Sequence, residues 1–262
     1  MFLGNDLVHW SGPAAREKAT PSRRTHRFID RVLHEREHPV LERLGVIRNG
    51  LSAASLSPVR GLWALWAAKE AAFKAAVKSA PGLPFSPRSI RIEFLPITRS
   101  FMNTEPCDGQ RWPLIPTVIT QPLARGLAHV RNQVYEVLWE HHHGFVHALA
   151  LGPFSSGHAP REDHQFSTIW NTVRRHASRI PSERASDAVR RIALQLLAAD
   201  QPVGRVGIIR ELLRTGRLGP PIFHDGSPRR ELDLTLTHDG SWGAAGILCR
   251  PAPGRWKRRA PA

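Results

Sequence analysis

The chain has 262 residues, of which 41% are hydrophobic and 23% are charged, and this balance is typical of a folded protein rather than a disordered one. Its length suits one large domain or two domains of roughly 100 to 150 residues each. The net charge of +15 indicates a surface that attracts anions, whether nucleic acids, phosphorylated small molecules or acidic proteins. Only Cys107 and Cys249 are present, which excludes a disulfide framework.

The first residues, MFLGNDLVHW, lack the basic leader and apolar core of a secretion signal, and we expect a cytoplasmic protein that is not inserted in a membrane. Phe2 to Val8 is predicted to form a short strand. Asp6 lies among Leu3, Leu7 and Val8, and since Asp is depleted inside strands it is either a turn residue or a ligand. The sequence alone favours the turn.

The next predicted element is an amphipathic helix over Arg27 to His38, which ends before Pro39. His34 and His38 are four residues apart, a spacing that would suit a metal ion. A solvated helix face is the better interpretation of these charged residues.

The segment Leu62 to Lys78, LWALWAAKEAAFKAAVK, is predicted to be the central helix because it is rich in Ala, Leu and Lys and free of Gly and Pro. Glu70 falls within an apolar stripe of this helix, where an unpaired carboxylate would be costly. Lys74 lies one turn further on and can pair with it. The helix is therefore either a core helix with an internal ion pair or part of a catalytic site. The stripe consists of Leu62, Trp66, Phe73 and Val77.

Strands are predicted after Pro81, first at Ser89 to Leu95 and then in a hairpin of Gln133 to Trp139 and Gly144 to Leu151. The three histidines 141–143 would lie in the hairpin turn, where consecutive side chains point in different directions and cannot easily share a metal ion. A solvated turn is expected there. The breaker-rich stretch that begins at Gly152 is predicted to be a domain linker.

The last third of the chain is predicted to begin with a helix over Ser182 to Leu197 and a short second helix over Gly207 to Arg214. A hairpin follows over Glu231 to Leu248, with Asp239 and Gly240 as its two-residue turn. His238 closes the first strand of this hairpin on the side of its leucines. Taken alone, it is a semi-buried histidine.

Three short segments of the chain together resemble the signature segments of the phosphopantetheinyl transferase superfamily. They are GNDLV at 4–8, WAAKEAAFK at 66–74 and LTLTHDGSWGAAGI at 234–247. The segment RFIDRVLHEREH also resembles the Arg-Phe helix of the holo-acyl-carrier-protein synthase branch. Each motif alone is weak, whereas three in one chain form a much stronger pattern.

The resemblance implies a site for magnesium and coenzyme A. Asp6 and Glu70 would hold the metal ion, whose hard-oxygen preference both carboxylates satisfy. Lys74 would contact the coenzyme A phosphates and offset charge on the leaving group. Thr237 and His238 match the Ser-His pair that holds coenzyme A phosphates. Arg190 resembles an arginine of the preceding helix.

The implied reaction is attack by a serine hydroxyl of an apo acyl or peptidyl carrier protein on the β-phosphate of coenzyme A, which releases adenosine 3',5'-bisphosphate. Glu70 would accept the serine proton, directly or through a water molecule. Which carrier protein is the target, and whether acylated coenzyme A is accepted, stay open, as does the oligomeric state.

The resemblance and the chain length together imply an α+β fold made of two related halves, a pseudodimer with one coenzyme A site in the cleft between them. The motif order is the reverse of that in the pseudodimeric branch of the family. The motif order is that of the single-motif-set branch, in a chain about twice as long. The expected organisation is an N-terminal half 1–152, a linker 153–165, a C-terminal half 166–250 and a basic tail 251–262.

Two residues depart from the family pattern. His9 stands where the family usually has an acidic residue, which puts metal affinity in doubt, and Asp239 puts an anion near a proposed phosphate site. A catalytically silent relative that binds coenzyme A or a carrier protein is therefore one alternative. The other is a nucleic-acid-binding protein, favoured by the basic tail and by WNTVRRHASR at 170–179. It is the less favoured because no RNP-like, helix-turn-helix or zinc-finger pattern is found.

Overall fold

The computed structural model describes residues 1–9, 23–39, 58–95, 124–141, 144–154, 173–199, 206–213, 216 and 218–249. The mixture of helices and antiparallel strands agrees with the predicted α+β class. The N-terminal part contains β1 (Phe2–His9), α2 (Arg23–Val32), η1 (Glu35–Glu37), α4 (Pro58–Ser79), η2 (Pro87–Ser89), β2 (Ile90–Leu95), β3 (Ala124–Val130), β4 (Gln133–His141) and β5 (Phe145–Phe154). The C-terminal part contains β6 (Val173–Arg179), η4 (Ser182–Arg184), α6 (Ala185–Ala198), β7 (Gly207–Leu212), β8 (Leu218–His224), β9 (Leu232–Asp239) and β10 (Trp242–Cys249).

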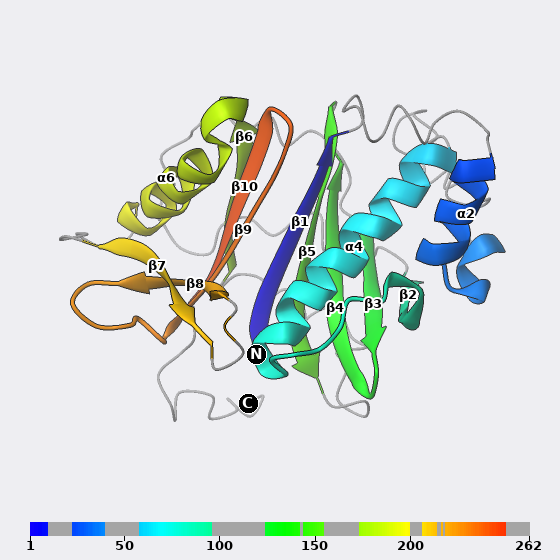
Figure 1. Ribbon diagram of the computed structural model, residues 1–262, viewed down its shortest axis with the longest axis horizontal. Helices are drawn as coiled ribbons and strands as arrows, with labels where there is room; N and C mark the ends of the chain where they lie inside the picture. Colours follow the sequence, from blue (N-terminus) through cyan, green and yellow to red (C-terminus); the bar gives the residue numbers. More distant parts are fainter. Residues whose placement is uncertain are drawn as a thin grey trace, which may run out of the picture.

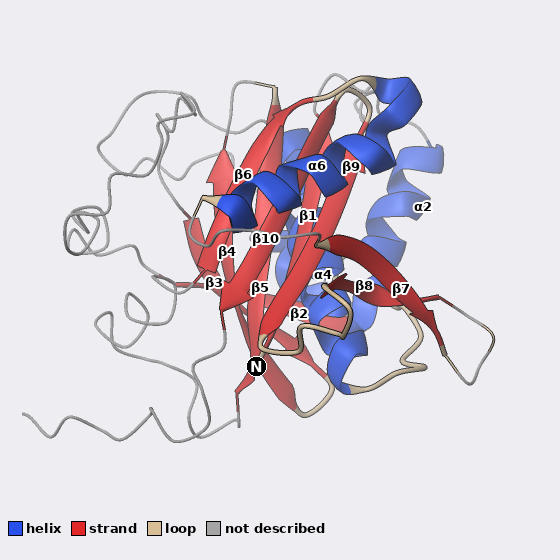
Figure 2. Ribbon diagram, turned by 90° about the vertical axis from the view of Figure 1, so that its left-hand side faces the viewer, coloured by secondary structure: helices blue, strands red, loops and turns tan. Residues whose placement is uncertain are grey.

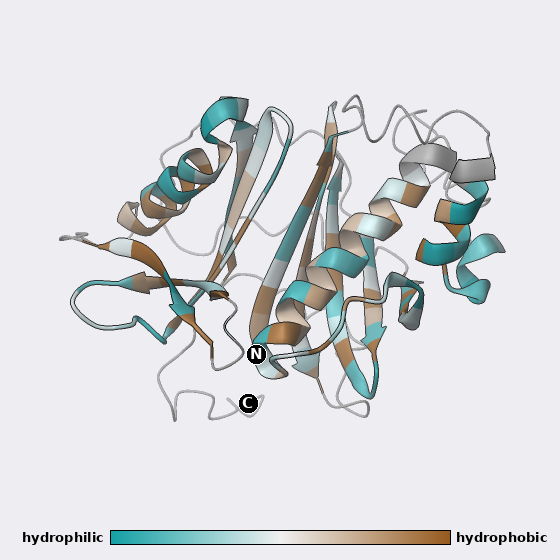
Figure 3. Ribbon diagram, viewed as in Figure 1, coloured by the Kyte–Doolittle hydropathy of each residue, from teal (hydrophilic) through white to brown (hydrophobic). Residues whose placement is uncertain are grey.

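Two antiparallel sheets lie between the helices α4 and α6 (Figures 1 and 2). The N-terminal sheet has the strand order β1-β5-β4-β3-β2, and α4 packs on its β1 and β5 strands. The C-terminal strands have the order β6-β10-β9, with α6 on β10 and β9, and the separate β7–β8 hairpin lies beside β9. In Figure 3, α2 carries mainly hydrophilic residues, whereas hydrophobic segments lie along the strands.

Apart from α2 and the short 3-10 helices, the described elements of the two parts follow one order: a strand, a long helix and four further strands. In both, the first strand pairs with the last, and the last with the one before it: β1-β5-β4 in one part and β6-β10-β9 in the other. The two strands after the helix form an antiparallel pair in both, β2–β3 and β7–β8.

The sheets meet through apolar side chains on the faces that point away from the helices. Leu3 and Leu149 of the N-terminal sheet belong to one buried cluster with Val173 and Leu248 of the C-terminal strands. Burial of this apolar area stabilises the contact between the two parts. No described helix is both long enough and apolar enough to cross a membrane.

The sequence predicted most elements, with α4 longer than expected and the Arg27–His38 helix divided into α2 and η1. The deepest face of α4 is not the predicted stripe but a row of alanines, whereas Trp66, Phe73 and Val77 are only partly buried. The alanines Ala67, Ala68, Ala71, Ala72, Ala75 and Ala76 are all 1% exposed or less.

Three sequence predictions are wrong. Gly207 to Arg214 is not a helix, because Gly207–Leu212 pairs with β8 as strand β7. Asp6 is not a turn residue but lies inside β1, paired with Ala148 of β5. The hairpin turn after β9 is Gly240-Ser241, since Asp239 still pairs with Trp242, and Gly240 has the positive φ of 57° that the turn requires. The histidine side chains 141–143, the linker beyond Phe154 and the basic tail lie outside the described residues.

Candidate functional site

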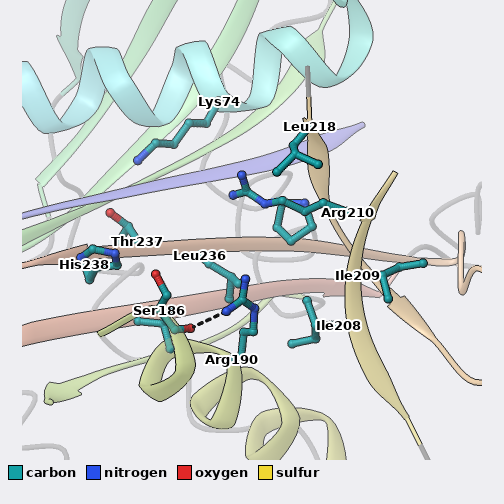
Figure 4. Close-up of a pocket in the computed structure, with 12 residues that line it drawn as sticks. Lys74, Ser186, Arg190, Ile208, Ile209, Arg210, Leu218, Leu236, Thr237 and His238 are labelled. Carbon is teal, nitrogen blue, oxygen red and sulfur yellow. Dashed lines mark hydrogen bonds between the residues drawn. The ribbon is translucent and has the colours of Figure 1, made fainter. Parts of the chain in front are cut away.

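A cleft of about 490 Å³ lies between the two parts of the chain (Figure 4). One end is formed by α4, and the remainder by α6, β9 and the β7–β8 hairpin. It combines cationic side chains with apolar ones, which suits an anionic ligand that also has an apolar or aromatic part. The lining residues are Lys74, Ser186, Val189, Arg190, Ile208, Ile209, Arg210, Leu218, Pro221, Leu236, Thr237 and His238.

Two carboxylates and a lysine meet at the α4 end of the cleft. The Lys74 Nζ atom lies 2.6 Å from Asp6 Oδ1 and 3.5 Å from Glu70 Oε2. Asp6 is buried, whereas the side chains of Glu70 and Lys74 are partly exposed. Asp6 and Glu70 therefore surround one cationic position.

The glycine of the GNDLV segment brings β1 close to α4. A Cβ atom at Gly4 would lie 1.9 Å from the carbonyl oxygen of Ala71, far inside the contact distance. Any side chain at position 4 would overlap the backbone of α4, so glycine is required there. The close packing puts Asp6, two residues further along β1, within reach of Lys74.

The three charges influence one another. Burial, and then the negative charge of Asp6, raise the pKa of Glu70 to about 7, although Lys74 acts in the opposite direction. Burial lowers the pKa of Lys74, but the charges of Asp6 and Glu70 outweigh it and the net pKa is raised. Lys74 is thus a permanent cation beside two crowded carboxyl groups.

Thr237 and His238 reach this site from β9. The Thr237 hydroxyl donates a hydrogen bond to Asp6 Oδ1 at 3.1 Å. His238 is exposed and lines the cleft. The pair expected to hold phosphates thus lies beside the carboxylates, but the hydroxyl of Thr237 is directed to Asp6.

Arg190 lines the cleft from α6, where its guanidinium donates to the Ser186 carbonyl and lies 3.2 Å from Asp187 Oδ1. Both partners are on the same helix, and the Arg190–Asp187 pair is exposed, so it holds the arginine only weakly. The guanidinium can therefore turn toward a phosphate in the cleft. All four residues predicted to bind coenzyme A line the cleft: Lys74, Arg190, Thr237 and His238.

Sequence reasoning missed Arg210 and the apolar wall of the cleft. Arg210 and Ile208 extend from β7 into the cleft (Figure 4), and Pro221 of β8 also lines it. The wrong prediction of a helix over this segment concealed the arginine, because a strand and a helix direct it differently. No motif in the sequence marks this hairpin as part of a site.

Asp239 and His9, which depart from the family pattern, interact with each other. The backbone N–H of His9 donates to Asp239 Oδ2 at 2.9 Å. The Asp239 carboxylate thereby binds the end of β1, and it does not line the cleft. The anion that the sequence puts beside the phosphate site is thus engaged elsewhere.

The donor set fits a magnesium ion. Asp6 and Glu70 supply hard oxygen atoms within reach of one cation. The pKa of Glu70 is raised first by burial and then by the negative charge of Asp6, and a metal ion would offset that charge. Among the described residues, no group of three or more His, Cys, Asp or Glu side chains could hold a metal ion. Two carboxylates are sufficient where substrate phosphates and water complete the coordination.

The other lysine of the WAAKEAAFK segment has a different environment. Lys69 is 0% exposed, and its Nζ lies 2.6 Å from Glu37 Oε2 and donates to the carbonyls of Val32 and Ile90. This buried pair joins α4 to η1 and β2, and neither residue lines the cleft. His34, predicted on a solvated face, accepts a hydrogen bond from the Arg36 N–H.

The segment that favoured nucleic-acid binding is partly internal. Residues 173–179 form β6, where Arg175 is ion-paired with Glu140 of β4. Val173 and Ala177 are buried. These contacts hold part of the basic segment against the protein.

The comparisons with known proteins bear on the N-terminal part alone. The family model of the 4'-phosphopantetheinyl transferase superfamily matches residues 2–114, a segment that carries Asp6, Glu70 and Lys74 and ends before Arg190, Thr237 and His238. The search of curated proteins found no match. The match agrees with the predicted phosphopantetheine transfer in general, while the substrate, the metal and the product stay predictions. The chain is thus similar to the 4'-phosphopantetheinyl transferase superfamily over residues 2–114.

Proposed function

We propose that the protein transfers the 4'-phosphopantetheine group of coenzyme A to a serine of an apo carrier protein, as a magnesium-dependent enzyme of the holo-acyl-carrier-protein synthase type. One observation carries the proposal: residues more than 160 positions apart line one cleft, namely Lys74, Thr237 and His238. Lys74 contacts Asp6 and Glu70, and Thr237 donates to Asp6. Coenzyme A, as a single ligand, would account for the GNDLV and WAAKEAAFK segments of the N-terminal part and for the LTLTHDGSWGAAGI segment of the C-terminal part.

The chemistry of the cleft matches that of coenzyme A. The ligand has a diphosphate, a 3'-phosphate and an adenine ring, and the cleft offers Lys74, Arg190, Arg210 and His238 to the phosphates. Arginine side chains bind phosphate oxygens through paired N–H donors. The apolar wall of Ile208, Pro221 and Leu236 suits the purine ring.

Asp6 and Glu70 would hold magnesium against the diphosphate. A bound magnesium ion supplies neutralisation of charge on the phosphate oxygens. Lys74 also offsets charge on the phosphate oxygens, because its ammonium lies beside both carboxylates and faces the cleft.

In the reaction, the serine Oγ of the carrier protein forms a bond to the β-phosphorus, and the bond from that phosphorus to the bridging oxygen breaks. The pantetheine phosphate is then esterified to serine, and adenosine 3',5'-bisphosphate leaves with the former bridging oxygen. Glu70, which is partly exposed at the cleft end, accepts the serine proton, directly or through water. Lys74 stabilises charge on the phosphate oxygens as the leaving group departs.

The common order of elements supports a pseudodimer of two related α+β halves, 1–152 and 166–250, joined by residues 153–165 and followed by a tail at 251–262. Both halves pair their first strand with their last, and the cleft takes residues from each. In this arrangement α4 and α6 are equivalent helices that supply different parts of one site.

The partner would be an acidic acyl or peptidyl carrier protein in the cytoplasm. The net charge of +15 favours rapid encounter with an acidic partner. Encounter driven by charge weakens as salt rises, since exposed charges are screened.

The test is the intact mass of a panel of apo carrier proteins after incubation with this protein, coenzyme A and magnesium. A gain of one phosphopantetheine mass on at least one carrier is expected for the wild type and for Glu93→Gln, an exposed residue of β2. Glu70→Gln, the same chemical change at the cleft, should abolish the gain.

A mass gain unaffected by Glu70→Gln would contradict the assigned site. No gain on any carrier, together with magnesium-dependent binding of coenzyme A in calorimetry, would instead identify a catalytically silent relative. Absence of both would contradict the proposal entirely.

A further inference from the structure

The two parts of the chain are joined along one pair of strands by side chains instead of a backbone ladder. β1 is the outer strand of its sheet and β9 is the outer strand of the three-stranded sheet. The backbone N–H groups of β1 donate to side-chain oxygens of β9 at three places: Leu3 to Asp233, Asn5 to Thr235 and His9 to Asp239. We call this set of contacts the β1–β9 seam.

The seam has one fixed alignment. In all three contacts the residue of β9 stands 230 positions after the residue of β1, so the strands run in the same direction without an offset between contacts. Such contacts satisfy the N–H groups of an outer strand, which would otherwise lie unpaired. They also bury the polar face of β9, whose Asp233, Thr235 and Thr237 are each 7% exposed or less.

Thr237 belongs to the same face of β9, but its hydroxyl has a different partner. It donates to Asp6 Oδ1, the oxygen that Lys74 also contacts. Thr237 thus lies between the second and third contacts of the seam and also lines the cleft. The alignment of the seam decides which residue of β9 stands beside Asp6.

Lys78 secures the seam from α4. Its Nζ donates to the carbonyl oxygens of Leu3 and Leu234 and to Asp233 Oδ1, at 2.6, 2.8 and 3.0 Å. A single buried ammonium thus joins α4, β1 and β9. It lies one helical turn after Lys74 and on the same side of α4.

We infer that Lys78, Asp233 and Thr235 are positioning residues, which set β9 against β1 and thereby hold His238 opposite the carboxylates Asp6 and Glu70. A shift of β9 by two residues, which would keep the same face toward β1, would move His238 by roughly 6 to 7 Å along the strand. Coenzyme A could then no longer contact both ends of the cleft at once. The inference rests on the proposed function.

The test measures how much magnesium tightens the binding of coenzyme A, by calorimetry with and without the metal. We call the ratio of the affinity with magnesium to the affinity without it the magnesium gain. The gain requires both ends of the cleft to hold the same diphosphate, and in the wild type it should be at least about tenfold. Lys78→Met keeps the aliphatic stem but loses all three bonds, and we expect the gain to fall below about threefold. Affinity without magnesium, which depends on the cationic cleft, should change much less.

Two further variants separate positioning from stability. Thr235→Val keeps the shape of the strand while losing the bonds to Asn5, and it should reduce the gain in the same direction even if Lys78→Met fails to fold. Lys69→Met removes a buried ion pair elsewhere on α4 and should lower the melting temperature without changing the gain.

The outcomes distinguish the two claims. A wild type that binds no coenzyme A refutes the proposed function and the inference with it. A wild-type gain that persists in folded Thr235→Val and Lys78→Met refutes the inference alone. An equal loss of the gain in Lys69→Met would also refute it, because the effect would then follow stability.

Discussion

The Thr237 hydroxyl donates to Asp6 Oδ1 across 3.1 Å, and this bond joins residues that are 231 positions apart. A hydrogen bond to a charged group contributes roughly 1.5 to 3 kcal/mol. We therefore predict that Thr237→Val lowers kcat/KM about tenfold or more, whereas Thr237→Ser, which keeps the hydroxyl, stays near the wild type. Steady-state kinetics with coenzyme A and an apo carrier protein measure both. Equal activity of the two variants would show that the hydroxyl has no function.

Lys74→Met should lower kcat by roughly 100-fold to 1000-fold, because a preorganised cation would no longer stabilise the phosphate oxygens. Single-turnover mass measurements can detect a residual rate of this size. The melting temperature should also fall, because the buried Asp6 carboxylate would lose its cation, so the rates are compared at a temperature where both proteins are folded. A rate within threefold of the wild type would exclude Lys74 from the chemistry.

Arg210→Ala should weaken coenzyme A binding about tenfold, through the loss of a charge-assisted hydrogen bond to phosphate. The matched control is Arg191→Ala, an exposed arginine of α6 that does not line the cleft. Calorimetry at two salt concentrations measures both variants. A comparable effect of the control would mean that only the overall charge of the protein matters.

Lys69→Met should lower the free energy of unfolding by roughly 3 to 5 kcal/mol, because it leaves the Glu37 carboxylate buried without its cation. Glu37 and Lys69 are both 0% exposed, and Glu37 also accepts from the N–H groups of His34 and Ile92. Urea unfolding followed by tryptophan fluorescence gives the value. A loss below 1 kcal/mol would contradict a structural role for the pair.

The stability of the fold should decrease on acidification partly through His176 of β6. Burial, and then the positive charge of His147, lower the pKa of His176, while Glu140 opposes them. The unfolded chain therefore binds this proton more readily, so the stability from the neutral ring is present above the ordinary pKa near 6.5 and is lost as the pH falls through the lowered value.

The measurement for His176 is the melting temperature at pH 7.5 and pH 5. His176→Gln should show a smaller decrease between these two values than the wild type. His129→Gln, a change at a partly exposed histidine that pairs with Glu93, is the control. A decrease in His176→Gln equal to that of the wild type would assign the acid sensitivity to other groups.

The elements that the sequence predicted well have strong local patterns. The alanine-rich composition of α4 and the alternating residues of β2 and β9 each identify one type of structure. The relation between Glu70 and Lys74 also follows from helical spacing, and their ion-pair distance is 3.5 Å. Local sequence patterns were therefore sufficient to predict these elements and this ion pair.

The sequence failed where the environment decides the structure. Three of the six residues of β7, at 208, 209 and 212, have apolar side chains, a spacing that a helix also shows. Only the pairing with β8 makes this segment a strand. For Asp6, the preference of aspartate for turns is overridden by an ion pair with Lys74, which is 68 positions further along the chain. Local propensity contains no information about such a partner.

The polar face of β9 illustrates the same limit. Alternation of leucines with Asp233, Thr235 and Thr237 is typical of a strand with one side in water. The structure buries that side against β1. An alternating pattern identifies the two faces of a strand but not whether the polar one meets solvent or another strand.

The two lysines of the WAAKEAAFK segment are five residues apart, which separates them by about 140° around the helix. Lys69 is enclosed by four oxygen acceptors, and Lys74 faces the cleft. A planar guanidinium could not reproduce the convergence of four acceptors on one nitrogen, so arginine would be a poor substitute at Lys69. The WAAKEAAFK segment thus contains one lysine that stabilises the fold and one that acts in the proposed reaction. A chain that retains Lys69 but lacks Lys74 would keep the contacts of α4 with η1 and β2 while losing the cation that faces the cleft.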